Sequence, residues 1–262
     1  MEIFQHQLWG YQIQLPAAWQ HQEFAARDGF AVDIKAFEPD YQGNKLAQLL
    51  IHGEWNSLKK PVYDIWQRHL GKVSLMLGAK NLSSAPWEMA GAKGYEVEIV
   101  LPKKNRQRLW TGILENGMLV LSFLVLHWKD NREEMEPVLS KIIASLEYLQ
   151  GINELEVNEC GLPLPATAKP ADPLAIVTDI PDPDNWLAYK TKYSPGALQA
   201  FYMRELPRLD WTINRYVPYP NQGELPFSRL LMNKAGQDYS LGIIPGGEDG
   251  QTGSIILKAK PR

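Results

Sequence analysis

Residues 94–128, GYEVEIVLPKKNRQRLWTGILENGMLVLSFLVLHW, predict an antiparallel sheet. Two predicted strands flank a proline-containing turn: Tyr95–Ile99, which alternates apolar and polar residues, and Arg108–Leu114. Such alternation is typical of strands with one buried face. Asn116-Gly117 is a dipeptide that favours a tight hairpin, and the apolar run Met118–Trp128 follows it. Three consecutive strands are therefore expected to pair through short turns.

Outward from these strands the apolar residues change from the strand period to the helical one. Pro61–Leu77 repeats apolar residues at helical spacing, with a proline suited to the first turn. A second helical stripe consists of Met135, Val138, Leu139, Ile142 and Leu146. Further strands are predicted at Tyr11–Leu15, Phe30–Phe37 and Leu46–Trp55. Strands and helices in this order predict an α/β sandwich domain over residues 1–150.

Residues 151–185 differ in composition from both flanks. They hold seven acidic residues, one lysine and six prolines, and the prolines disfavour regular elements. We expect an acidic linker here, docked along the protein as an ordered strap because it also carries apolar side chains. Residues 186–262 predict a small β-α-β-β-β domain, whose helix starts at the Ser194 cap and Pro195. The expected fold class is α+β, with two domains.

Composition limits the classes of function. The chain has 262 residues, of which 45% are hydrophobic and 22% charged, as in globular proteins. A net charge of −3 gives no general attraction to nucleic acid, and the single cysteine, Cys160, excludes an intramolecular disulfide. No signal peptide is recognisable, and the run Met118–Leu126 is half of the roughly 20 residues that a membrane helix needs. We expect a soluble protein without membrane insertion, cytoplasmic by default and extracytoplasmic only if an export signal has been removed.

The start of the chain resembles a known family. Gly10–Trp19, GYQIQLPAAW, resembles the f-x-lPxxW opening of PsbP-like domains. The strand at Gly94–Val97, the hairpin through Gly117 and a final helix ending near Leu146 follow that family's order, over roughly residues 3–149. The resemblance implies an α/β/α sandwich around an antiparallel sheet. Members of the family are mostly non-enzymatic and share no catalytic residues, so the resemblance implies none here.

Three groups of residues are candidates for metal or phosphate sites. His52 and Glu54 share one face of a predicted strand, but two ligands are too few for a closed metal site. The acidic run Asp179–Asn185 lacks the glycine and the distal glutamate of a calcium loop. Five glycines from Gly242 to Gly253 lack the G-K-[ST] of a phosphate loop and favour a hairpin loop. We therefore expect no metal and no cofactor.

The candidate catalytic residues also have structural interpretations. His69 lies in the apolar stripe of the first helix and His127 at the end of a buried strand, positions typical of structural histidines. Glu96 and Glu98 share a strand face and suggest paired-carboxylate chemistry. Cross-strand ion pairs would explain these glutamates without catalysis. The facing arginines in that interpretation are Arg106 and Arg108. No catalytic residue is predicted.

Aromatic and basic residues remain as candidates for partner contacts. The chain has nine tryptophans, and large amphipathic rings are enriched at interface hot spots, although they also fill cores. The basic turn near residue 104 suits an acidic partner, or is a solvated hairpin tip. The predicted partner-binding residues are Trp9, Tyr11, Trp19, Trp55, Trp110, Lys103, Lys104 and Arg106.

We therefore expect a non-enzymatic binding or accessory protein that engages a protein partner. Two alternatives stay open: an enzyme with a site assembled between the domains without a recognisable motif, and a carrier of a small apolar ligand. A shallow apolar patch favours the first function and a closed apolar cavity the carrier. A deep polar cleft with shifted pKa values favours the enzyme. The oligomeric state stays open at this point.

Overall fold

The computed structural model describes residues 1–26, 29–37, 45–77, 83–100, 107–128, 132–221, 223, 225–246 and 252–259. The chain divides into two compact units. The first comprises Met1–His6, Tyr11–Phe24 and Phe30–Tyr148, and the second comprises Gln7–Gly10, Ala25–Gly29 and Leu149–Arg262. Antiparallel sheets with three α-helices confirm the α+β class for the described residues.

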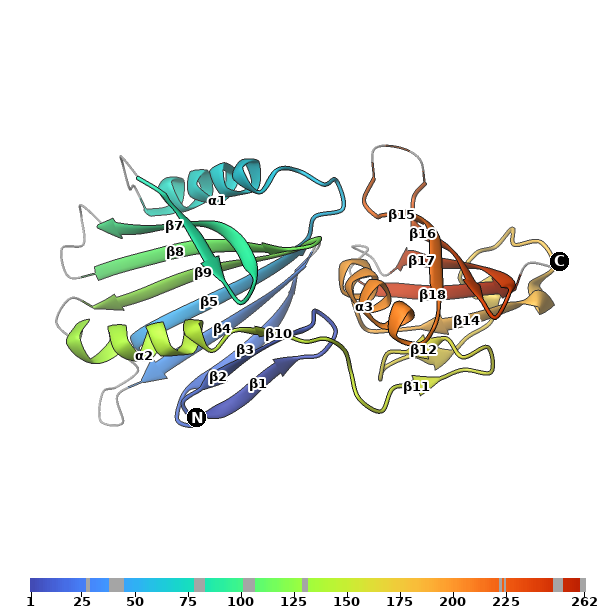
Figure 1. The fold of residues 1–262 in the computed structure, drawn as a ribbon, viewed down its shortest axis with the longest axis horizontal. Helices are drawn as coiled ribbons and strands as arrows, with labels where there is room; N and C mark the ends of the chain where they lie inside the picture. Colours follow the sequence, from blue (N-terminus) through green and yellow to red (C-terminus); the bar gives the residue numbers. More distant parts are fainter. Residues whose placement is uncertain are drawn as a thin grey trace. The chain divides into compact units, whose positions relative to one another are not determined.

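The larger sheet of the first unit has the strand order β3-β4-β5-β9-β8-β7-β6 (Figure 1). The strand pairs β5–β9, β9–β8, β8–β7 and β7–β6 are antiparallel. Asn116 of β8 lies opposite Leu119 of β9, where the hairpin is predicted. The strands are β3 (Gln20–Ala26), β4 (Gly29–Phe37), β5 (Lys45–Trp55), β6 (Ala85–Met89), β7 (Ala92–Val100), β8 (Gln107–Asn116) and β9 (Leu119–Trp128). A separate three-stranded sheet consists of β1 (Glu2–His6), β2 (Tyr11–Leu15) and β10 (Glu147–Tyr148).

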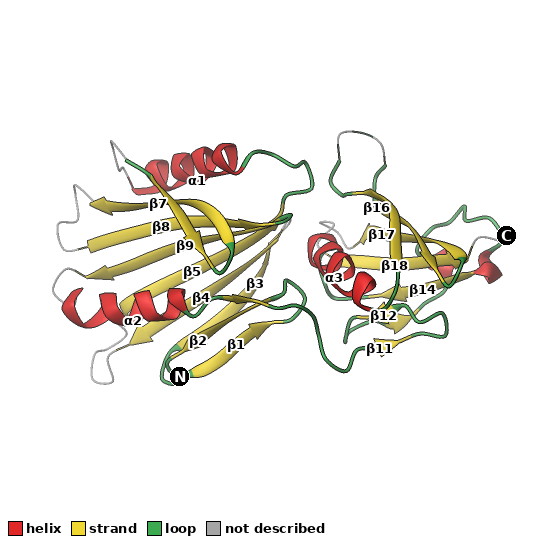
Figure 2. Ribbon diagram, viewed as in Figure 1, coloured by secondary structure: helices red, strands yellow, loops and turns green. Residues whose placement is uncertain are grey.

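Two helices cover opposite faces of the larger sheet (Figure 2). Helix α1 (Val62–Leu77) packs with strand residues that include Val97 and Ile99. Helix α2 (Arg132–Ala144) contacts β9, β5 and β2 and buries Met135, Leu139, Ile142 and Ile143. Successive strand residues point to opposite faces. Glu96 and Glu98, which alternate with Val97 and Ile99 along β7, therefore lie on the α2 side. The helical periods in the sequence therefore predicted both helices correctly.

The second unit contains an antiparallel sheet with the strand order β13-β14-β18-β17-β16-β15. Helix α3 (Pro195–Arg208) starts at the predicted cap, where the Ser194 hydroxyl accepts a hydrogen bond from the Ala197 N–H at 3.3 Å. Its fully buried residues include Leu198, Phe201 and Leu206. The strands are β13 (Lys169–Pro170), β14 (Trp186–Lys190), β15 (Thr212–Val217), β16 (Ser228–Lys234), β17 (Gln237–Gly246) and β18 (Thr252–Ala259).

Residues 151–185 group with the second unit. They contain short pieces of structure, with β11 (Glu156–Val157) paired to β12 (Pro163–Leu164) and single 3-10 turns at Pro173–Ala175 and Pro183–Asn185. Some apolar side chains pack as expected, because Leu162 and Ile180 are buried, whereas Val157 and Leu174 are 47% and 43% exposed. The predicted boundaries at residues 150 and 185 stay a prediction.

The structure adds elements that the sequence did not indicate. Strands β1, β3 and β6 were missed, because their residues show no sustained alternation of apolar and polar side chains. In the second unit the sequence predicts strands at residues 211–217, 227–233, 239–244 and 254–258, and among the described residues four strands follow α3 at these positions, although the β-α-β-β-β order counts only three. Gly242, which was grouped with the loop glycines, lies within β17 opposite Arg229.

Candidate functional site

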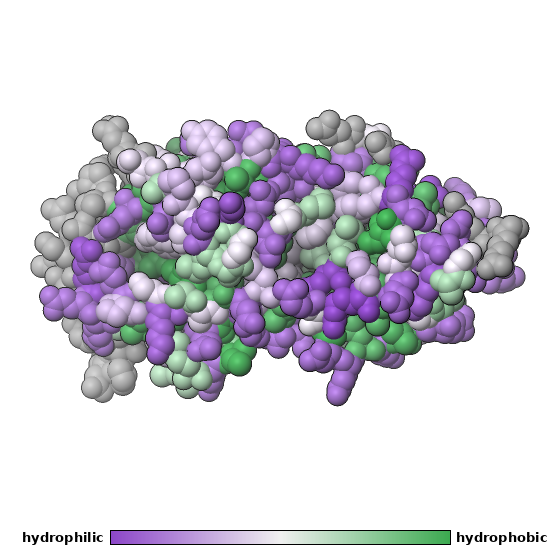
Figure 3. All heavy atoms as spheres, viewed as in Figure 1, coloured by the Kyte–Doolittle hydropathy of each residue, from purple (hydrophilic) through white to green (hydrophobic). Residues whose placement is uncertain are grey.

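A cleft of about 230 Å³ opens on the α2 side of the larger sheet in the first unit. Strands β6 to β9 and helix α2 contribute its lining, which mixes apolar and acidic side chains. Figure 3 shows apolar atoms in a hollow of this unit, with polar atoms around them. We call this feature the acidic cleft, and its main residues are Trp87, Glu96, Glu98, Trp110, His127 and Glu136.

Two tryptophans and a glycine shape the acidic cleft. The Trp87 indole meets the Trp110 indole and the Phe123 ring edge to face, with ring centroids 5.1 and 5.6 Å apart. Gly112 makes room for both indoles, because a Cβ atom there would lie 2.8 Å from Trp87 and 2.9 Å from Trp110. Each such ring pair adds about 0.5–1.5 kcal/mol beyond the area that it buries. Trp87 is therefore fixed and only 9% exposed, while Trp110 stays half-buried at the cleft.

Three glutamates make the cleft acidic. Glu96 accepts a hydrogen bond from the Trp110 indole N–H at 3.0 Å, which orients both side chains. Glu136 on α2 forms an ion pair with Arg132 at 2.6 Å, and Glu98 is exposed. Among the described residues that line the cleft, none is lysine or arginine, so its lining is net negative.

The pairing of β7 and β8 corrects the predicted ion pairs of Glu96 and Glu98. Trp110 lies opposite Glu98, and Arg108 lies opposite Val100. Arg106, the predicted partner, lies outside the described residues. A register shift by an even number of residues leaves every side chain on the same face, so the alternation pattern cannot detect it. Glu96 therefore binds an indole N–H, where a guanidinium was expected.

The histidines weighed as catalytic residues lie on different faces of the sheet. His69 on α1 donates to the Thr111 hydroxyl at 2.6 Å, because that hydroxyl itself donates to the Phe123 carbonyl at 2.7 Å. Burial, together with the positive charges of His52 and neighbouring basic residues of α1, lowers the pKa of His69 to about 4. His69 is thus a neutral structural histidine, whereas His127 lines the acidic cleft and is 8% exposed.

The predicted partner-binding residues separate into three groups. Trp9 and Tyr11 are buried, with exposed fractions of 3% and 0%. Trp19, Trp55 and Trp110 are half-buried, and only Trp110 among these lines the acidic cleft. The basic residues Lys103, Lys104 and Arg106 lie outside the described residues. Trp87, which the sequence gave no reason to pair with Trp110, completes the site through the β6–β7 pairing.

The candidate metal ligands do not assemble into a common site. Glu54 forms an ion pair with Arg68, and the carbonyl of His52 accepts a hydrogen bond from the Ser122 hydroxyl at 3.3 Å. Asp182 lies 3.9 Å from the Lys258 ammonium. Within the part of the chain that the structure describes, no three His, Cys, Asp or Glu residues lie close enough to hold a metal ion.

The described helices include none that is long and apolar enough to span a membrane.

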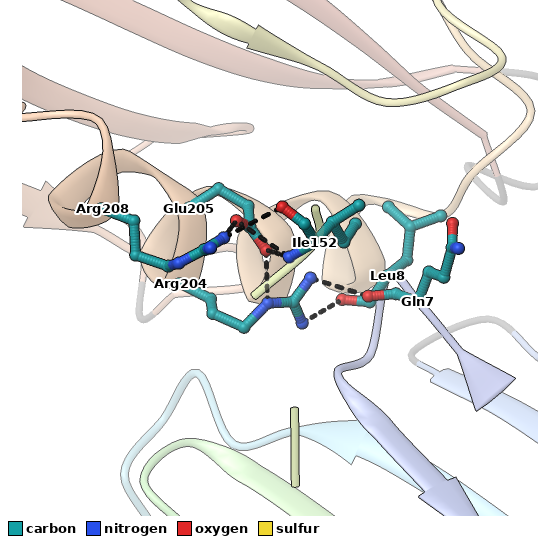
Figure 4. A network of polar contacts seen from close by, with 6 residues as sticks. All are labelled: Gln7, Leu8, Ile152, Arg204, Glu205 and Arg208. Carbon is teal, nitrogen blue, oxygen red and sulfur yellow. Dashed lines mark hydrogen bonds and ion pairs between the residues drawn. The ribbon is translucent and has the colours of Figure 1, made fainter. Parts of the chain in front are cut away.

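A buried carboxylate in the second unit was not singled out from the sequence. Glu205 on α3 is fully buried, and the guanidinium groups of Arg204 and Arg208 both bind it (Figure 4). The Ile152 N–H donates to its two oxygens at 3.1 and 3.3 Å. The backbone carbonyls that Arg204 also binds are those of Gln7 and Leu8. Because every partner is internal, this network stabilises the unit. The one available signal was the i, i+3 spacing of glutamate and arginine on a helix.

Comparisons with known proteins give likenesses in structure only. No family model matches the chain, and no curated protein matches it. The solution structure of cyanobacterial PsbP (CyanoP) from Synechocystis sp. PCC 6803 matches with a TM-score of 0.44 and 12% identity, over 56% of this chain and 91% of that chain. LpqN of Mycobacterium tuberculosis, described as involved in cell envelope biogenesis, matches at 0.41 and 9%, over 53% and 83%. A structure from Bacteroides thetaiotaomicron VPI-5482 matches at 0.38 and 11%, over 94% and 87%.

The first of these structures carries the name of the family that the start of the chain resembles. At such identities and TM-scores they carry no conclusion about activity, ligand or partner. The acidic cleft is therefore interpreted from its own residues and their chemistry.

Proposed function

We propose that this chain is a non-enzymatic accessory protein that binds a protein partner, with the acidic cleft holding one basic side chain of that partner. The observation that carries the proposal is the half-buried Trp110 indole beside Glu96 and Glu98. A cation over an indole gains about 0.5–1 kcal/mol at an exposed site and about 2 kcal/mol when desolvated. Nearby carboxylates add to this attraction, so the cleft favours a positively charged group.

The size of the cleft supports a side chain as its occupant. About 230 Å³ lies below the roughly 300–1,000 Å³ of pockets that enclose whole small-molecule ligands. A single arginine or lysine projecting from a partner needs less space. Arginine suits the site better than lysine, because its planar guanidinium can stack on an indole and bind a carboxylate at the same time. The partner surface is therefore expected to present an exposed arginine.

The test compares two short peptides that differ only in charge, one with a central arginine and one with the neutral isostere citrulline. The indole N–H resonances of Trp87 and Trp110, assigned by single replacement with phenylalanine, report on the cleft. The Trp211 indole, which donates to the Gly161 carbonyl at 3.0 Å in the second unit, serves as the internal reference. We expect the arginine peptide alone to shift the two cleft resonances in a saturable manner.

Two glutamate-to-glutamine variants, one inside the cleft and one outside it, test whether a cleft carboxylate attracts the arginine. Glu98→Gln removes an exposed carboxylate of the cleft and should weaken arginine binding about threefold to tenfold, since a charge pair at such a site is worth about 1 kcal/mol. Glu88→Gln removes a carboxylate of β6 that is not part of the cleft lining, and should leave binding unchanged. Equal shifts with citrulline, or no shift with either peptide, would contradict the proposal.

A further inference from the structure

The sheet of the second unit has a second face, on the side away from α3. Fully buried residues such as Leu241 and Ile255 alternate with residues of that second face. Arg229, Gly242 and Ile256 are successive cross-strand partners on β16, β17 and β18, so their side chains form one row across it. The row combines a cation, a position without a side chain and an apolar residue.

A groove of about 550 Å³ opens over this face. Ile244 and Ile256 supply its floor, and Ile176, Ile180 and Trp186 supply one wall. The volume lies within the roughly 300–1,000 Å³ of pockets that take small ligands. The lining is mainly apolar, so each methylene of a buried hydrocarbon chain would tighten binding about fourfold.

The wall of this groove is held in place by its own contacts. Ile180 packs against Ala188 and Ile256, and the Trp186 indole N–H donates to the Pro181 carbonyl at 3.0 Å. The Lys258 ammonium lies 5.2 Å from the centre of the Trp186 ring. The groove is therefore shaped by the packed segment that precedes β14 and does not depend on a ligand to form it.

Arg229 is the one cation that lines the groove within the described residues. It is half-buried, and its hydrogen bond goes to the Ser240 hydroxyl at 3.2 Å. No carboxylate of the described residues forms an ion pair with it. A guanidinium has five N–H donors, so most of them stay available to an anion. Gly242 lies opposite Arg229, and a Cβ atom there would lie 3.0 Å from the Ile256 side chain, so Ile256 forms the floor of the groove at this position.

We infer that this groove binds a fatty acid, with the carboxylate on Arg229 and the hydrocarbon chain along the apolar floor and wall. The groove is mainly apolar, and its cation, Arg229, has no ion pair with the described carboxylates. It therefore favours a ligand that has a hydrocarbon chain and one anionic end. A neutral apolar molecule would leave the partly desolvated guanidinium without a counter-charge. A cationic amphiphile would be repelled by it. Asp179 also lines the groove, but it is exposed, so the anionic end lies at Arg229 and not at this rim.

The test titrates the full chain with three ten-carbon amphiphiles: decanoate, decanol and decyltrimethylammonium, each below its micelle concentration. Calorimetry gives the affinity, and the indole N–H resonance of Trp186, assigned by replacement with phenylalanine, reports on the groove wall. We expect one equivalent of decanoate to bind, with decyltrimethylammonium at least about tenfold weaker, as the loss of a charged hydrogen bond implies. Decyl phosphate, which shares the anionic end, distinguishes a carboxylate from a phosphate-headed lipid. Decyl phosphate binding at least tenfold tighter than decanoate would assign the groove to phosphate-headed lipids and overturn the fatty acid.

Variants assign the two parts of the site. Arg229→Gln should weaken decanoate about tenfold and leave decanol unchanged, while Lys190→Gln, an exposed charge on β14, should change neither. Gly242→Val places a side chain in the row and should weaken all three ligands, with its unfolding transition checked in parallel. Equal affinity for decanoate and decyltrimethylammonium, equal effects of the two charge variants, or no binding of decanoate would overturn the inference.

Discussion

The buried histidine of helix α1 predicts a specific loss of stability in acid. In the folded protein His69 is stacked near Trp66, at 5.8 Å between ring centroids, and is bonded to the Thr111 hydroxyl. Its pKa falls to about 4, first because of burial and then because of the positive charges of His52, Lys72 and Arg68. In the unfolded chain its pKa returns to about 6.5.

The neutral form of His69 is thus favoured by the fold. Between pH 6.5 and 4 the unfolded chain binds more protons than the folded one, so the free energy of unfolding decreases as the pH falls through this window. A shift of 6.5 to about 4, at 1.36 kcal/mol per pH unit, corresponds to a loss of roughly 3 kcal/mol. Above pH 6.5 the group contributes no pH dependence, and below about 4 the loss levels off.

The assay is urea unfolding of the wild-type chain and of His69→Gln at a series of pH values from 8 to 4. Glutamine keeps a donor for Thr111 but does not titrate. The variant should be less stable at pH 8, where the packed imidazole is lost, yet it should lose roughly 3 kcal/mol less than the wild type between pH 6.5 and 4. Parallel curves for the two proteins would refute a buried neutral His69. His52→Gln serves as the control for the neighbouring charge and should reduce the slope only in part.

Three further outcomes follow from particular residues. Glu205→Gln should destabilise the second unit by about 1.5–3 kcal/mol in urea unfolding, because the half-buried Arg204 and the exposed Arg208 lose charged hydrogen bonds to a buried carboxylate, and the exposed Glu159→Gln should cost almost nothing. Gly112→Ala should cost about 1–3 kcal/mol and change the near-ultraviolet circular dichroism of the tryptophan pair, whereas Gly71→Ala, within α1 and with nothing within 4 Å of its Cβ position, should stabilise by about 0.5–1 kcal/mol. A fragment ending near Gln150 should unfold cooperatively by calorimetry, and a fragment that aggregates or lacks a transition would show that the predicted boundary is wrong.

The sequence predicted the elements whose signals are local. Apolar residues at helical spacing specified α1 and α2 to within a few residues, and Asn116-Gly117 placed the β8–β9 hairpin. Ser194 and Pro195 marked the start of α3. These signals succeed because a helix period, a cap and a tight turn depend on residues within a few positions of one another.

The sequence predicted single residues of the candidate site but not their contacts with one another. Glu96, Glu98 and Trp110 were each singled out from the sequence, but the glutamates were assigned to arginines and the tryptophan to a partner surface. The role of Gly112 on β8 depends on Trp87 of β6, two strands away, whose indole lies against it. Register and cross-strand neighbours bring together residues distant in sequence, and alternation is unchanged by a shift of two or four residues.

The sequence by itself thus determined the fold class and, in a strand that alternates such as Tyr95–Ile99, which residues share a face. The tertiary structure decided which of those residues meet: the Trp87–Trp110 pair beside Glu96, the buried Glu205 between two arginines, and Arg229 across from Gly242. The physical reason is that periodicity records burial along one segment. Site chemistry depends instead on the packing between segments, which is fixed only when the whole core has formed.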